Sequence, residues 1–190
     1  MSWFRGTAGH DDSSHVLVPR NRVETCPLYA LNVAIRIRLG ASADVDGAVS
    51  VYERSNLARR RGVWPNRAAR VEEVRALLSQ SGTWFLLAEE GSRVVGMAAA
   101  QPLRGDDPAD PPIPGGLFVN LLFVLPDRWG EGIGGAILDA VLAEAKKRDC
   151  TRIYLWTHED NERSHRLYRG RGFSPTGRIQ DEEGEWVREL

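Results

Sequence analysis

A turn rich in glycine is the part of the chain best suited to bind an anion. Gly130, Gly132, Gly134 and Gly135 stand within six residues, directly before a segment with helical periodicity. The first turn of a helix carries unpaired backbone N–H groups and the positive end of the helix dipole. Glycines at that place let these donors approach a phosphate or pyrophosphate closely. A tight strand-to-helix turn without a ligand accounts for the same glycines equally well, because short glycine patterns are common.

The spacing of three of these glycines also matches the dinucleotide-binding fingerprint, as Gly130-x-Gly132-x-x-Gly135. In that fingerprint the first glycine follows the strand almost directly, whereas residues 126–129 intervene here. The chain beyond the next strand is also too short for the rest of a doubly wound sheet. A nucleotide-dependent oxidoreductase is therefore the weaker alternative.

Three polar residues nearer the C-terminal end are spaced to share one helix face. Asn161, Ser164 and Tyr168 stand at i, i+3 and i+7, so a helix over 161–171 would present all three to one ligand. For the tyrosine, packing in the core beside neighbouring apolar residues is the alternative role.

The elements that must position these residues follow from periodicity and from turn residues. One strand–helix–strand unit, over 117–157, should be a crossover between parallel strands inside an otherwise antiparallel pattern. The fold class is therefore α/β (α+β), with a mixed, mostly antiparallel central sheet. A loop over 102–116 is expected to be exposed, because five of its fifteen residues are proline. The predicted strands are 33–39, 84–89, 93–101, 117–125, 152–157, 173–179 and 185–190, and the predicted helices are 42 or 44 to about 60, 66–79, 132–147 and 161–171.

Composition and charge narrow the class of protein. The 190 residues are 42% hydrophobic and 27% charged, which predicts one globular domain, over 33–190, after an irregular extension over 1–32. A net charge of −1 argues against a nucleic-acid partner.

The most apolar window, 117–125, is far too short to span a membrane. The first residues lack the apolar core of a signal peptide, and Cys26 and Cys150 have neither metal-ligand nor redox spacing. We therefore expect a cytoplasmic protein with no metal site.

Two motifs in this order resemble those of the GNAT N-acetyltransferases, and the resemblance covers about residues 33–190. It implies the acyl-CoA N-acyltransferase (GNAT) fold, with acetyl-CoA held in a V-shaped split between the fourth and fifth strands. It also implies direct transfer of the acetyl group to a primary amine, without an acyl-enzyme. The first motif is Leu122-Phe-Val124-x-Pro126 followed by Trp129-Gly130-x-Gly132-x-Gly134, and the second is Asn161-x-x-Ser164-x-x-x-Tyr168-x-x-x-Gly172-Phe173.

The resemblance also implies which residues hold the cofactor. The backbone over 122–124 would bind the pantetheine arm like an added strand. The backbone amides over 129–135 would cradle the pyrophosphate. Trp129 stands where the family often has Gln or Arg, which removes one side-chain contact. The cofactor-binding residues implied in this way are Leu122, Phe123, Val124, Trp129, Gly130, Glu131, Gly132, Ile133, Gly134, Gly135, Asn161 and Ser164.

Proton transfer at the amine and at the sulfur needs an acid and a base. In the family the tyrosine hydroxyl lies near the sulfur, and a phenol with a reference pKa of about 10 suits protonation of a thiolate. Tyr168 is therefore the predicted general acid. The base is left open, because the segment 117–125 holds no carboxylate and offers only Asn120. A relayed water chain is one alternative, and the candidate side chains are Glu53, Glu89, Glu90 and His158.

The acceptor is also left open. Acidic residues in the last strand pair, together with three Asp in the loop 102–116, would attract a cationic amine, but a solvated acidic turn explains them as well. An arginine-rich segment over 54–75, with a net charge of +5, suits the CoA phosphate, an acidic acceptor or partner, or simply an exposed helix face. The acidic residues are Asp181, Glu182, Glu183 and Glu185.

We therefore expect an acetyl-CoA-dependent N-acetyltransferase that acts on a primary amine of a small molecule, peptide or protein. The alternative on the same fold is a non-catalytic acyl-CoA-binding sensor or interaction module, which the missing carboxylate favours. The last strand pair is a possible homodimer contact.

Overall fold

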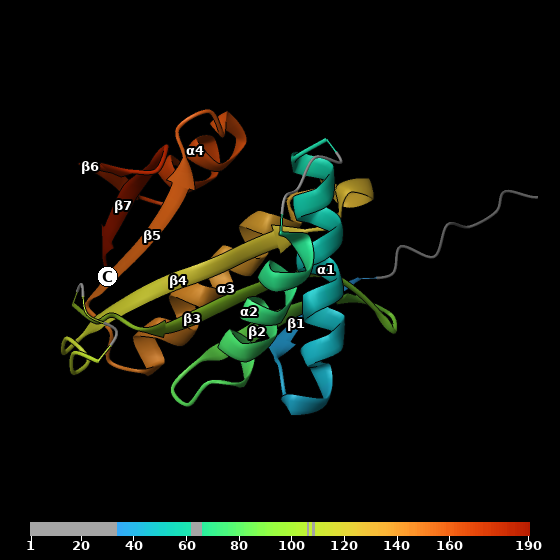
Figure 1. Ribbon diagram of the computed structural model, residues 1–190, viewed down its shortest axis with the longest axis horizontal. Helices are drawn as coiled ribbons and strands as arrows, with labels where there is room; N and C mark the ends of the chain where they lie inside the picture. Colours follow the sequence, from blue (N-terminus) through green and yellow to red (C-terminus); the bar gives the residue numbers. More distant parts are fainter. Residues whose placement is uncertain (1–33, 62–65, 106, 108) are drawn as a thin grey trace, which may run out of the picture. The chain divides into compact units, whose positions relative to one another are not determined.

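A seven-stranded sheet in the order β1-β2-β3-β4-β5-β7-β6 organises the protein (Figure 1). The computed structural model describes residues 34–61, 66–105, 107 and 109–190. All of these belong to one unit, Val33–Leu190, and the predicted extension over 1–32 lies outside the described residues. The strands are β1 Ile35–Leu39, β2 Trp84–Glu90, β3 Arg93–Pro102, β4 Gly116–Val124, β5 Arg152–His158, β6 Ser174–Gln180 and β7 Glu183–Glu189.

Only the β4–β5 pair is parallel within this described sheet, and helix α3 (Ile133–Lys147) connects its two strands. Every other neighbouring pair is antiparallel. The predicted mixed, mostly antiparallel sheet is therefore confirmed. A single parallel pair does not provide the doubly wound sheet of a dinucleotide-binding fold, so that alternative is wrong.

Helices α1 and α3 cover opposite faces of the sheet (Figure 1). Phe123 of β4 packs edge-on against Tyr52 of α1, with ring centroids 5.1 Å apart. The next residue, Val124, lies beside Gly134 of α3. Successive strand residues point to opposite faces, so the two helices must lie on opposite sides. The helices are α1 Val45–Arg59, α2 Arg67–Ser79, α3 Ile133–Lys147 and α4 Glu162–Arg169, and short 3-10 turns occupy Ser42–Asp44 and Pro126–Arg128.

Burial between these layers makes the core. Leu87 and Met97 on the central strands are completely buried, as are Ile137 and Leu138 on α3. Burial of such a side chain stabilises the fold by about 1.5–3 kcal/mol. No helix among the described residues is both long and apolar enough to cross a membrane.

Helix α4 is shorter than predicted. It begins at Glu162 because Asn161 is its N-cap, whose Oδ1 accepts a hydrogen bond from the backbone N–H of Ser164 at 3.2 Å. The helix ends at Arg169, and Gly170 follows it as the C-cap. The predicted helix over 161–171 was therefore too long at both ends, and Asn161 caps the helix instead of extending its polar face.

Candidate active site

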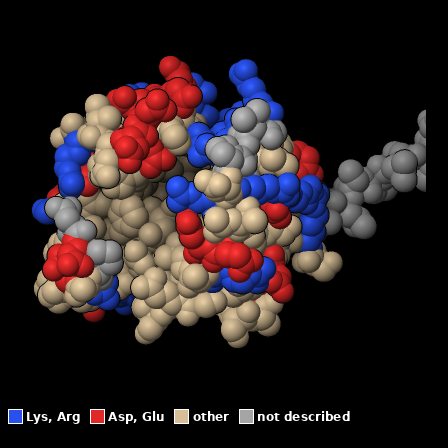
Figure 2. All heavy atoms as spheres, viewed as in Figure 1, with Lys and Arg blue, Asp and Glu red and all other residues tan. Residues whose placement is uncertain are grey.

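Strands β4 and β5 separate partway along their length. They pair only from Gly116 to Val119 and from Arg152 to Leu155. Beyond these residues β4 stays on β3, and β5 stays on β7. Figure 1 shows the two strands diverging from a common end, and Figure 2 shows a hollow in the surface over this region. The separation leaves an edge of β4, over 120–124, without a strand partner on its β5 side.

A bulge marks the place where the separation starts. Leu121 pairs with Ala99, and Val119 pairs with the next residue of β3, Ala100. Asn120 is therefore an extra residue between two paired positions, with no partner on β3. A bulge of this kind bends a strand and increases its twist, which directs β4 away from β5.

The glycine turn lies at the open end of this separation, after β4. Gly130 and Gly132 have φ angles of +93° and +81°, and a Cβ added at either would meet no atom within 4 Å. Helix α3 makes its first internal hydrogen bond from the N–H of Ala136 to the carbonyl of Gly132, at 3.0 Å. The N–H groups over 130–135 precede that bond and are available to a ligand. Open space, left-handed glycines and unpaired donors fit a diphosphate group.

Of the other two glycines, Gly134 has room for a side chain at ordinary contact distance, whereas Gly135 is closely packed. A Cβ on Gly134 would lie 3.7 Å from Val124 and 3.8 Å from Leu167. A Cβ on Gly135 would collide with the guanidinium of Arg171, which donates to the Gly135 carbonyl at 3.2 Å. The first half of the turn is therefore open, as a phosphate cradle requires, and Gly135 is closely packed, while phosphate binding at the turn stays a prediction.

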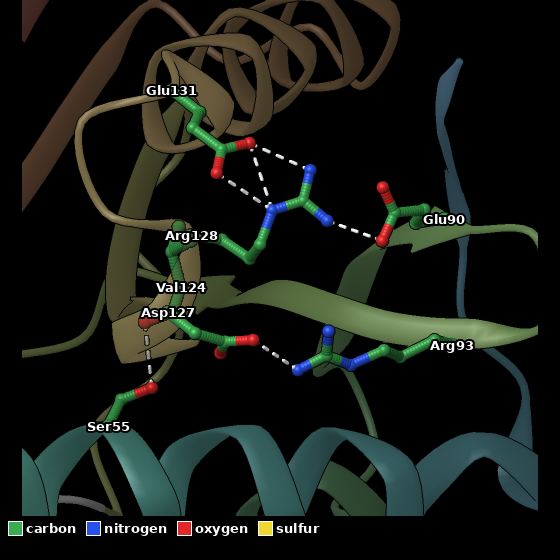
Figure 3. A network of polar contacts seen from close by, with 7 residues as sticks. All are labelled: Ser55, Glu90, Arg93, Val124, Asp127, Arg128 and Glu131. Atoms are coloured by element: carbon green, nitrogen blue, oxygen red, sulfur yellow. Dashed lines mark hydrogen bonds and ion pairs between the residues drawn. The ribbon is translucent and has the colours of Figure 1, made fainter. Parts of the chain in front are cut away.

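Charged side chains fix the flank of the turn, as Figure 3 shows. Arg128 donates to Glu131, at 2.7–3.0 Å, and also to Glu90 on β2. Arg93 donates to Asp127 at 2.6 Å. The hydrogen bonds from Arg128 and Arg93 lower the pKa of Glu131 and of Asp127 respectively. The network ties the turn to the β2–β3 hairpin, and it pairs the carboxylate of Glu131 with a cation beside the glycine turn.

Trp129 links the turn to β4 and to α4. Its Nε1 donates to the carbonyl of Val124 at 2.7 Å. The hydroxyl of Ser55 on α1 donates to the same carbonyl at 2.9 Å, as Figure 3 shows. The guanidinium of Arg163 lies over the indole ring, 4.6 Å from its centroid. Within the described chain no ion pair engages Arg163, so it is a cation available beside the turn. The sequence prediction missed Arg163, because nothing local links it to Trp129.

Tyr168 lies inside the fold. Its side chain is 6% exposed and packs against Phe173 and Trp186, with ring centroids 5.8 and 6.1 Å away. Burial raises the pKa of Tyr168 to about 12, and the hydrogen bond with Ser164 opposes that rise. The phenol is therefore protonated at neutral pH, with its ring held in the core.

Each candidate base has a partner. Glu53 accepts hydrogen bonds from Arg67 at 2.6 and 3.0 Å, and Glu89 accepts two from Arg38, also at 2.6 and 3.0 Å. Glu90 is held by Arg128, as described above. Both Glu89 and Glu90 lie on β2, which β3 separates from β4.

His158 is the candidate that borders the opening, at the end of β5. Its Nε2 lies 3.1 Å from Oε1 of Glu183, and its carbonyl lies 3.1 Å from Nε2 of His165.

The rims of the hollow carry both charge signs. Figure 2 shows acidic residues on one rim, over the β5–β7 region, and basic residues on the other, over α1 and α2, where they are arginines. The alternative of a solvated acidic turn is wrong for Glu185, which is 7% exposed. Its carboxylate accepts hydrogen bonds from Thr176 at 2.8 Å and from Arg178 at 3.2 Å. On the opposite rim, burial lowers the pKa of Arg59, while Asp160 and Glu183 act to raise it.

The residues described contain no group of three or more His, Cys, Asp or Glu placed to hold a metal ion. Cys150 is a free thiol whose pKa is raised by burial, which lowers its nucleophilic thiolate fraction. Cys26 lies outside the described residues.

The family model for the acetyltransferase (GNAT) family matches residues 49–173, and the chain belongs to this family. The sequence is similar to mouse N-acetyltransferase 8B, with 34% identity over 109 residues, which cover 56% of this chain and 44% of that protein. It is also similar to the aminoglycoside N(6')-acetyltransferase type 1 of Stenotrophomonas maltophilia, with 28% identity over 63% of this chain and 78% of that protein. The chain spans about half the length of the first curated relatives it matches.

Solved structures share the fold. The PaiA N-acetyltransferase of Thermoplasma acidophilum, in complex with coenzyme A, has a TM-score of 0.65 at 16% identity, covering 83% of this chain and 99% of that one. The acetyltransferase YncA of Salmonella typhimurium, with acetyl-CoA, has a TM-score of 0.61 at 20% identity, covering 83% and 94%. The predicted GNAT fold is therefore confirmed.

Proposed function

We propose that the domain over 33–190 is an acetyl-CoA-dependent N-acetyltransferase that acetylates a primary amine of a small molecule, peptide or protein. The observation that carries this proposal is the separation of β4 and β5, which ends beside a turn with two open left-handed glycines. The structural relatives with bound coenzyme A or acetyl-CoA support the choice of cofactor.

The residues that would hold acetyl-CoA are largely backbone. The N–H groups over 130–135 and the positive end of the α3 dipole would bind the pyrophosphate. The β4 edge at Leu122 and Phe123 would bind the pantetheine amides as an added strand does. The Val124 carbonyl already accepts two hydrogen bonds, so this contact should rest on the residues before it. Arg163 would add a cation beside the phosphates.

Acetyl-CoA supplies the thioester whose carbonyl carbon the amine attacks. In the transfer a C–N bond forms and the C–S bond breaks, while one proton leaves the nitrogen and one reaches the sulfur. We assign the second proton to Tyr168, because a phenol is protonated at neutral pH and can donate to a departing thiolate. His158 would take the first proton, with Glu183 at 3.1 Å to stabilise the imidazolium.

Isothermal titration with acetyl-CoA, with NAD and ATP as controls, tests the cofactor. We expect micromolar binding of acetyl-CoA alone. Thiol release over a panel of amines then tests the transfer. Binding of NAD or ATP in preference to acetyl-CoA would contradict the proposal.

A non-catalytic acyl-CoA sensor on the same fold is the second candidate. It is favoured by the absence of a carboxylate on β4 and by the ion pairs that engage Glu53, Glu89 and Glu90. Turnover separates the two candidates, since a sensor would bind acetyl-CoA and release no thiol with any amine.

A further inference from the structure

We infer that Asn120 binds the acceptor amine, with its side-chain oxygen accepting a hydrogen bond from the amine N–H. This inference rests on the proposed function and extends it, because it names the group on β4 that orients the nucleophile. Two independent observations carry it, the place of Asn120 in the sheet and the state of its side-chain oxygen.

Asn120 stands at the closed end of the separation. The last β4–β5 pair is Val119 with Leu155, one residue before it. The bulge leaves Asn120 without a partner on β3 as well. In the described structure it is thus a residue of β4 with no strand partner on either side, at the point where the two strands part.

The side-chain oxygen of Asn120 lacks a hydrogen-bond partner. Its Oδ1 is buried, although the residue as a whole is half-buried. Among the residues described, only Thr83 Oγ1 shares this condition. A buried acceptor without a donor is unfavourable, and such groups are rare in folded proteins. A ligand that brings an N–H to this oxygen would remove the penalty.

The position of Asn120 along β4 indicates that the acceptor amine is the group that donates to its side-chain oxygen. The phosphate cradle lies after the C-terminal end of β4, so a pantetheine arm extended along the strand places its thioester end toward the closed end. A strand rises about 3.3 Å per residue, which puts Asn120 about 13 Å along β4 from Val124. Asn120 therefore lies at the end of the arm where the acyl group must meet the amine.

The side-chain amide of Asn120 can orient the acceptor amine, but it cannot remove a proton from it. A carboxamide oxygen accepts hydrogen bonds but takes up no proton near neutral pH. A neutral primary amine has two N–H groups and one lone pair, so it can donate to Oδ1 and still direct the lone pair at the thioester carbon.

The experiment compares Asn120→Leu and Asn120→Asp with the wild type. The Leu variant keeps the approximate volume and removes the acceptor, so we expect kcat/KM for the amine to fall at least about tenfold. The dissociation constant for acetyl-CoA should stay within about twofold of the wild-type value. The Asp variant keeps an acceptor oxygen, so its kcat/KM should exceed that of the Leu variant. It should also gain a new dependence on pH, rising as the carboxyl ionises.

Thr83→Val is the matched control, because it removes the other buried, unpartnered oxygen, at the start of β2. Its kcat/KM should equal the wild-type value, which separates relief of a buried polar group from an effect on the amine. Circular dichroism and thermal unfolding check the folding of each variant. If the Leu variant does not fold, Asn120→Ser replaces it, since Ser cannot reach the same position with its shorter side chain.

Two results would overturn the role of Asn120: an unchanged kcat/KM in the Leu variant, or equal losses in the Leu and Asp variants with an unchanged pH profile. A wild-type protein that binds acetyl-CoA and acetylates no amine would instead overturn the proposed function, and the role of Asn120 with it.

Discussion

The two sides of the opening between β4 and β5 differ in the groups they present, which are backbone groups on one side and side chains on the other. On the β4 side the candidate binding groups are backbone, namely an unpaired strand edge and the N–H groups of a glycine turn. On the β5 side they are side chains, from α4, β5 and the β6–β7 hairpin. A backbone site depends on the shape of the chain and tolerates many side chains. A side-chain site changes with each substitution, so the second side is where specificity for an acceptor can vary.

Filling the glycine cradle should give the largest effect. Gly132→Trp places a large side chain in the open space. The backbone at this position has a φ of +81°, which residues with a side chain disfavour. We expect acetyl-CoA affinity to fall more than about 100-fold, as measured by isothermal titration, which is about 2.7 kcal/mol.

Gly91→Ala is its control, because Gly91 also has a positive φ, +60°, and nothing within 4 Å, but it lies in the β2–β3 turn. Equal loss of affinity in both variants would mean that backbone strain, and not occupation of the cradle, causes the effect.

The contrast between the two sides also explains what the sequence could predict. The glycine turn and most strand and helix positions follow from local patterns, which is why they were predicted nearly in place. The sequence could not divide the four glycines, because Gly135 faces Arg171, which is 36 residues away. The same pattern, a polar residue followed three positions later by another, describes both an N-cap and a helix face, and so Asn161 was misplaced.

Contacts between distant residues account for the other omissions. The Arg128–Glu90 pair joins residues 38 positions apart, and Trp129 meets Arg163 only once α4 is placed. The bulge at Asn120 arises from the pairing of β4 with β3, which no local pattern specifies. A prediction from sequence therefore finds the backbone side of the site and leaves most of the side-chain side undetermined.

On the β5 side of the opening, the first test concerns Tyr168, the proposed general acid. Tyr168→Phe keeps the ring that packs against Phe173 and Trp186 and removes the hydroxyl alone. If that hydroxyl protonates the sulfur, kcat should fall about 100-fold while acetyl-CoA affinity changes little. Thiol release at saturating substrates measures this. Unchanged kcat would assign Tyr168 to packing and leave proton donation to solvent.

The same variant tests the state of the phenol in alkaline solution. The pKa of Tyr168 is about 12 in the folded protein and 10 in its ordinary environment, so folding favours the protonated form. The resulting stability is complete below pH 10 and is lost as the pH rises from 10 through 12, up to about 3 kcal/mol. Urea unfolding at pH 8 and at pH 11 should therefore show a larger loss for the wild type than for Tyr168→Phe. Parallel losses would contradict the burial of this hydroxyl.

Substitution of Arg163 should have the smallest effect on acetyl-CoA affinity. It tests whether a side chain from the β5 side takes part in binding at the glycine turn. It reaches the glycine turn from α4 by stacking over Trp129, so Arg163→Gln should weaken acetyl-CoA binding by about three- to tenfold, and less so at high salt. Arg169→Gln is the matched control, because Arg169 lies on the same helix and stacks over Trp186, 5.4 Å from its ring centroid. If the two substitutions weaken binding equally, the general positive charge of α4 is what matters. If only Arg163→Gln does so, a side chain from α4 completes a cradle that is otherwise made of backbone.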